Sequence, residues 1–99
     1  MGFTLQNENI QRVVYSQREQ EIFAILPQDG SRIQSKMLVE LFWKDKERPY
    51  HFHISVMDSL RSLIRKIEHN KEPFVIKTSS SRGPHGISTW IEPRKENQK

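Results

Sequence analysis

The fold prediction depends most on residues 54–67, ISVMDSLRSLIRKI. Apolar residues recur there every three or four positions, which is the spacing of one face of an α-helix. That face consists of Val56, Leu60, Leu63, Ile64 and Ile67. Ser55 is a good N-cap and Asp58 stands in the capping-box position, so we expect the helix to begin at Ser55. The other side of the helix is polar and basic, and it either faces solvent or contacts a charged partner.

The positive charge of the chain is concentrated in the half that contains this helix. The 99 residues carry 16 basic and 12 acidic side chains, a formal net charge of +4. Residues 1–43 hold four basic and five acidic side chains, whereas residues 44–99 hold twelve and seven. This asymmetry favours a polyanionic partner, most often nucleic acid, although a merely soluble basic protein can also show it.

Several classes of protein do not fit the composition. The chain has no cysteine, which excludes disulfides, zinc–thiolate sites and cysteine nucleophiles. No apolar run approaches the roughly 20 residues that span a bilayer, and the N-terminus lacks the basic-then-apolar order of a signal peptide. We therefore expect a soluble cytoplasmic protein without a membrane partner.

A hairpin and a first helix are expected before the central part of the chain. FTL and IQRVVY flank the turn-rich QNEN, which predicts an N-terminal β-hairpin within residues 3–15. In the following SQREQEIFAIL, Ser16 and Glu19 form a capping box, and Pro27 ends the helix.

The next stretch, SRIQSKMLVELFW, predicts a second helix with a capping box between Ser31 and Gln34. We expect its core-facing stripe to consist of Ile33, Met37, Leu38, Leu41 and Phe42. The charged loop KDKERPYHFH follows over residues 44–53, and its final HFH is a candidate for a brief strand. Further on, FVIKT and ISTWIE flank SSSRGPHG, which predicts a second β-hairpin with a long tip.

Three helices followed by a β-hairpin are the layout of a winged helix-turn-helix domain, an α+β fold. We expect one such domain over residues 1–92, with the N-terminal β-hairpin at its start and the C-terminal hairpin as its wing. A flexible polar tail is expected over residues 93–99. In this layout the third helix enters the major groove, and the wing lies along the backbone or in the minor groove.

Residues 15–90 resemble the winged-helix effector domains of OmpR-type response regulators. YSQREQEIFAIL is similar to their first helix, and GSRIQSKMLVELFWKD is similar to their second, which ends near a tryptophan. The family's apolar-x-x-Leu-x-x-Lys-apolar pattern matches Leu60, Leu63, Lys66 and Ile67. Its wing is similar to Thr78 and the segment RGPHG, residues 82–86. The departures are extra residues in the wing turn, Ile64 where the family often has a basic residue, and no receiver domain, so no phosphorylation switch is implied.

The expected DNA contacts come from the third helix and the wing. Arginines can bond a guanine edge bidentately or clamp a phosphate, and serines let a helix backbone approach closely. The helix contacts are Ser55, Ser59, Arg61, Ser62, Arg65 and Lys66, and the wing contacts are Lys77, Arg82 and His85. A solvated helix would more typically carry Glu–Lys pairs one turn apart, and between Asp58 and Glu68 this face has no acid. The alternatives are an ordinary solvated face for the helix and a solvated loop for the wing.

No pattern in the chain indicates catalysis. There is no Gly-x-Ser-x-Gly elbow, no glycine-rich phosphate loop before a helix and no recognisable pair of carboxylates. His51 and His53 have no carboxylate or cysteine partner at ligand spacing, so we expect no metal site. We therefore expect neither an enzyme nor a cofactor.

The favoured function is sequence-specific binding of double-stranded DNA by a transcription regulator. A chain that reads DNA with one helix covers only a short site, so a homodimer on repeated half-sites would suit this function. Two alternatives stay open. One is a winged-helix module that docks on polymerase, replication or defence proteins. Its candidate surface is the loop 44–50, since the resembling family's loop can meet RNA polymerase there. The other is a protein that binds the repeats of a plasmid or phage replication origin.

Overall fold

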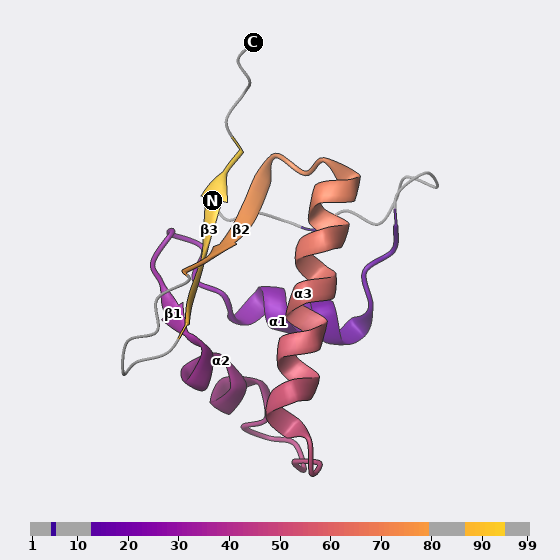
Figure 1. Ribbon diagram of the computed structural model, residues 1–99, viewed down its shortest axis with the longest axis vertical. Helices are drawn as coiled ribbons and strands as arrows, with labels where there is room; N and C mark the ends of the chain where they lie inside the picture. The colour runs from indigo at the N-terminus through magenta and orange to yellow at the C-terminus, as the bar shows by residue number, and fades with distance from the viewer. Residues whose placement is uncertain (1–4, 6–12, 80–86, 95–99) are drawn as a thin grey trace.

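The computed structural model describes residue 5, residues 13–79 and residues 87–94. In order along the chain, its elements are α1 (Gln17–Ile25), β1 (Ile33–Gln34), α2 (Ser35–Phe42), α3 (Phe52–Asn70), β2 (Phe74–Thr78) and β3 (Ser88–Pro93). The predicted α+β class with three helices and a C-terminal hairpin is confirmed (Figure 1). The predicted N-terminal hairpin lies mostly outside the described residues, and residues 13–15 belong to no strand.

Helix α1 forms as its sequence predicts. The Ser16 hydroxyl accepts a hydrogen bond from the Glu19 N–H at 3.1 Å, and the Glu19 carboxylate accepts one from the Ser16 N–H at 2.7 Å. This reciprocal pair satisfies two donors that a helix start otherwise leaves open. The helix ends at Ile25, before Pro27, and its buried face carries Ile22.

Helix α2 begins later than predicted, and the predicted capping box is wrong. Ile33 and Gln34 are extended because they pair with Thr89 and Ser88 of β3, which makes them the short strand β1. Gln34 then occupies the N-cap position without a side-chain cap hydrogen bond to any described residue. A long-range strand pairing therefore replaces the local cap that the sequence favours.

The predicted apolar stripe of α2 is also partly wrong. Leu38 and Phe42 are buried as expected, and so is Val39, which the stripe did not include. Met37 and Leu41 are exposed. The helix is thus rotated about its axis relative to the prediction, because its buried face must meet both α1 and α3.

Helix α3 begins at Phe52, three residues before the predicted N-cap Ser55. The sequence HFH is therefore not a strand, since two of its residues form the first helical turn. The N–H of Phe52 donates to the Pro49 carbonyl at 3.1 Å, and the indole N–H of Trp43 donates to the Phe52 carbonyl at 3.1 Å. The second contact links the start of α3 to Trp43, the residue that follows α2.

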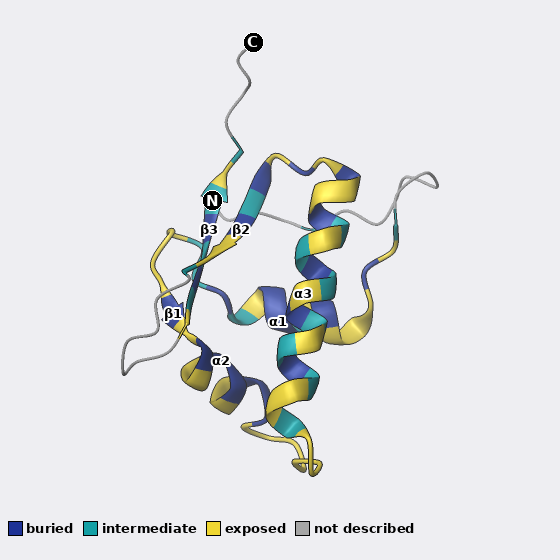
Figure 2. Ribbon diagram, in the orientation of Figure 1, coloured by how far each residue is buried: buried dark blue, intermediate teal, exposed yellow. Residues whose placement is uncertain are grey.

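The core-facing side of α3 agrees with the prediction, except that Ile64 is only half-buried. The fully buried side chains on this helix are Val56, Leu60, Leu63 and Ile67. They alternate with exposed positions along the helix, as the blue and yellow bands of α3 show in Figure 2. α3 thus contacts α1, α2 and β2, and the core lies between these elements.

The sheet is antiparallel with the order β1-β3-β2. Ile76 faces Ile91 and Lys77 faces Trp90 across the predicted hairpin, which is confirmed. Because side chains alternate between the two faces of a strand, Ile76 and Ile91 enter the core while Lys77 and Trp90 lie on the outer face. None of the helices in the described part of the chain combines the length and apolar character needed to cross a bilayer.

Candidate nucleic-acid interface

One side of α3 is exposed along most of the helix. We call Ile54, Asp58, Arg61 and Arg65 the outer stripe, because residues three or four positions apart share a helix face and all four are exposed. At a rise of 1.5 Å per residue, the stripe is about 16 Å long. The residues predicted from the sequence did not include Ile54, although its helical spacing from Asp58 and Arg61 was visible there.

The two arginines of the outer stripe form few interactions with described residues. The Arg61 guanidinium contacts the Asp58 carboxylate at 3.0 Å, and both side chains are well exposed. Exposed pairs of this kind contribute about 0–1 kcal/mol, so Arg61 can exchange this partner for another acceptor. Arg65 forms no ion pair with any described residue. Both guanidinium groups are therefore available to a ligand with phosphate or base-edge acceptors.

The remaining predicted residues of α3 form a second stripe, rotated by one residue from the first. Ser55, Ser59, Ser62 and Lys66, the flanking stripe, have the same 4-3-4 spacing, but all four are half-buried. The Ser55 hydroxyl accepts a hydrogen bond from the guanidinium of Arg18, which belongs to α1. The structure thus separates the predicted helix contacts into two exposed arginines and four half-buried residues, of which Ser55, Ser62 and Lys66 bond to α1.

The Lys66 side chain links α3 to α1. Its ammonium group lies 2.8 Å from the Glu19 carboxylate and donates to the Val14 carbonyl at 3.0 Å. Burial by itself would raise the pKa of Glu19. The hydrogen bonds from Lys66, the Ser16 N–H and Ser62 outweigh burial and hold this pKa below its ordinary value. Glu19 therefore stays ionised, and Lys66 serves the packing of α1 on α3.

The C-terminal half of α3 also holds the segment that precedes α1. The side-chain amide of Asn70 accepts from the Val13 N–H at 2.8 Å and donates to the Val13 carbonyl at 3.0 Å. The Tyr15 hydroxyl donates to the buried Glu72 carboxylate at 2.7 Å. Lys66 and Asn70 on α3, and Glu72 just after it, thus hold α3 to α1 and to the segment before α1, away from the outer stripe.

Among the predicted wing residues, Lys77 lies in the described strands, and Arg82 and His85 lie outside the described residues. Lys77 is exposed on the outer face of the sheet opposite Trp90. The guanidinium of Arg32 lies 4.0 Å from the ring centre of Trp90, and the Trp90 indole N–H donates to Glu92 at 2.7 Å.

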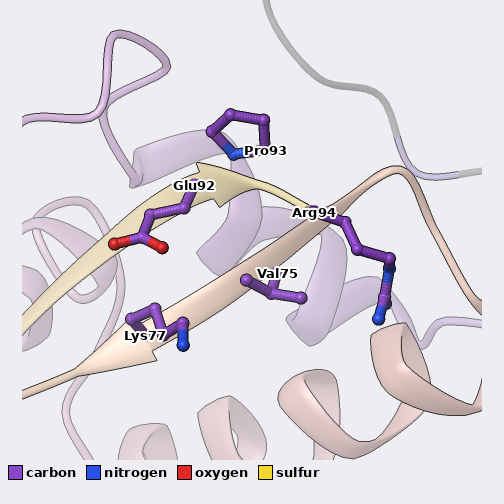
Figure 3. Close-up of a pocket in the computed structure, with 5 residues that line it drawn as sticks. All are labelled: Val75, Lys77, Glu92, Pro93 and Arg94. Carbon is purple, nitrogen blue, oxygen red and sulfur yellow. The ribbon is translucent and has the colours of Figure 1, made fainter. Parts of the chain in front are cut away.

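A cavity of about 260 Å³ lies on this outer face, lined by Val75, Lys77, Glu92, Pro93 and Arg94. Figure 3 shows that the Arg94 side chain points away from Lys77 and Glu92. The Arg94 guanidinium is occupied by the Glu72 carbonyl at 2.7 Å and the Glu68 carboxylate at 3.3 Å. The charged groups around the cavity do not converge on one point, so the cavity provides no built site for a small ligand.

The loop 44–50 is exposed along its whole length, yet it is tied to the helices. Lys46 pairs with Glu21 at 3.2 Å, and Arg48 pairs with Glu40 at 2.7 Å. Tyr50 is 91% exposed at the end of this loop. The loop is thus anchored through two charged residues and presents Tyr50 to solvent.

Within the described ranges, no three histidine, aspartate or glutamate side chains come close enough to hold a metal ion.

Comparison with protein-family models found no match, and searches of curated proteins and of solved structures found none either.

Proposed function

We propose that this chain is a winged helix-turn-helix protein that binds double-stranded DNA and regulates transcription. The observation that carries the proposal is the division of α3. Its inner side is core, and its outer stripe presents Arg61 and Arg65 without a buried partner. The hairpin of β2 and β3 follows α3 directly, as expected for a wing.

The dimensions of the outer stripe suit the major groove. The groove is about 12 Å wide and admits one α-helix, whose exposed face can contact the base edges. A stripe of about 16 Å corresponds to roughly five base pairs at about 3.4 Å each. Arg61 and Arg65 each carry the planar donors that match the O6 and N7 acceptors of guanine.

Most of the affinity in this proposal comes from phosphate contacts. The outer stripe itself has only two basic residues and one acid, so Lys77 and the predicted wing contacts Arg82 and His85 would add backbone contacts. Each neutralised phosphate contributes about −0.9 to the slope of log K against log salt for duplex DNA. We therefore expect binding that weakens steeply as salt rises.

The test is a fluorescence-anisotropy titration with duplexes selected from a random pool, carried out at two salt concentrations. Replacing Arg65 by alanine should weaken binding by about 1–3 kcal/mol if the arginine reads a base. Lys44→Ala removes the same charge from the exposed loop and is the matched control. No duplex binding by the wild-type chain at low salt would refute the proposal.

A second candidate function is docking on a protein such as RNA polymerase, and the loop 44–50 favours it. Tyrosine and arginine dominate the energetics of protein interfaces, and this loop presents an exposed Tyr50 beside Arg48. A pull-down that captures purified polymerase after nuclease treatment, and that fails with Tyr50→Ala, would support docking. If duplex binding is unchanged by Tyr50→Ala in the same preparation, the two functions use separate surfaces.

A further inference from the structure

The outer stripe of α3 begins with an apolar residue. Ile54 is 58% exposed and is the third residue of the helix. Its spacing places it on the same face as Asp58, Arg61 and Arg65. A single exposed isoleucine is ordinary in a folded protein. Ile54 differs from such a residue because it shares its helix face with two exposed arginines.

Ile54 takes no part in the core. The buried positions of this part of α3 are Val56 and Leu60, and the partly buried side chains packed against the core include Met57 but not Ile54. Because isoleucine is branched at Cβ, it has essentially one side-chain rotamer in a helix. The first turn that carries Ile54 is itself fixed by the hydrogen bond from Trp43 to Phe52. Its apolar surface is therefore held rigidly outward.

We propose that Ile54 packs against the C5-methyl group of a thymine in the major groove, in the same duplex that Arg61 and Arg65 contact. This inference rests on the proposed DNA-binding function and adds a specificity determinant to it. Thymine is the base that presents a methyl group in the major groove, and apolar side chains recognise this group by contact. Ile54 lies in the N-terminal turn of α3, and N-terminal residues of a recognition helix are among those that contact base edges.

The geometry also predicts the spacing of the site. Ile54 and Arg61 are seven residues apart, which is two helical turns or about 10 Å. At about 3.4 Å per base pair, this length spans about three base pairs. We therefore expect the preferred duplex to hold a thymine about three base pairs from a guanine.

The experiment uses the full chain and the duplex obtained by selection. Each thymine is replaced in turn by deoxyuridine, which removes only the methyl group, and the Kd is measured by fluorescence anisotropy. One replacement should weaken wild-type binding about fourfold, the loss expected for one buried methyl group. Ile54→Ala should weaken binding to the thymine duplex and should not distinguish thymine from deoxyuridine at that position.

Leu41→Ala is the matched control, because it shortens an exposed aliphatic side chain on α2 (41% exposed) and should keep the wild-type discrimination. An unchanged unfolding midpoint of Ile54→Ala would confirm that its effect is not a loss of structure. If Ile54→Ala keeps the wild-type deoxyuridine penalty, or if no thymine shows a penalty, the inference is overturned while DNA binding stands. If the wild-type chain binds no duplex at low salt, the proposed function fails and the inference with it.

Discussion

Replacing Lys66 by methionine tests how α1 is held against α3. Methionine keeps most of the aliphatic stem but removes the ammonium group, which contacts Glu19 at 2.8 Å and the Val14 carbonyl at 3.0 Å. Removing one partner of a buried ion pair costs about 3–5 kcal/mol. The Lys66 side chain is 24% exposed, so water can replace part of the lost interaction. We therefore expect the free energy of unfolding to fall by about 2–4 kcal/mol.

The loss should depend on pH in a defined direction. In the wild-type protein the pKa of Glu19 is lower in the folded state than its ordinary value of 4.5. The ionised carboxylate therefore adds stability above pH 4.5, and this contribution disappears as the pH falls through the folded pKa. Without Lys66, the hydrogen bond and the charge that lower the pKa of Glu19 are lost, so this pKa should rise relative to wild type and protonation at low pH should relieve the buried charge. The difference between wild type and Lys66→Met should be largest at pH 7 and should shrink below pH 4.5.

Urea denaturation at pH 7 and pH 4, followed by the fluorescence of the buried Trp43, measures both quantities. Arg65→Met, on the outer stripe of the same helix, is the control and should change stability by less than about 0.5 kcal/mol. The double variant Glu19→Gln/Lys66→Met should recover part of the loss, because it leaves no buried charge without its partner. A loss below about 1 kcal/mol at pH 7, or the same loss at both pH values, would refute the assigned role of the pair.

Three further changes test the fold with the same denaturation assay. Asn70→Ala should cost about 1–3 kcal/mol because it removes both hydrogen bonds to Val13, and the Val13 amide should then exchange faster with deuterium. Leu60→Ala should cost about 2–5 kcal/mol by opening a cavity in the core, whereas Leu41→Ala on the exposed side of α2 should change stability by less than about 0.5 kcal/mol. Ser16→Ala should cost about 1 kcal/mol through loss of the α1 cap, and an unchanged midpoint would show that the cap is dispensable.

The elements that the sequence predicts correctly depend on local chemistry. The capping box of Ser16 and Glu19, the proline after α1 and the apolar face of α3 all act within a few residues. The hairpin of β2 and β3 also follows from two strand-forming runs that flank a polar loop. In each of these segments, the local preference and the packed structure favour the same conformation.

The helix starts that the sequence misplaces depend on contacts with distant residues. Ile33 and Gln34 are strand rather than helix because Thr89 and Ser88, far along the chain, supply their pairing partners. Phe52 begins α3 because the carbonyl of its first turn is held by the indole of Trp43. Good local caps at Ser31 and Ser55 were outweighed by these tertiary interactions.

The candidate interface shows the same division at the level of single side chains. The sequence alone determines that α3 is amphipathic and that its polar side carries serines and basic residues. Helical spacing from the apolar face also puts Asp58, Arg61 and Arg65 away from the core and Ser59 and Lys66 toward one flank. It does not show whether a neighbouring element covers that flank, and tertiary structure decides this. α1 packs on one side, where its Glu19 engages Lys66, and leaves Arg61 and Arg65 exposed on the other. Helical periodicity sets which side chains share a face, and only the packed neighbour determines which face remains open to a ligand.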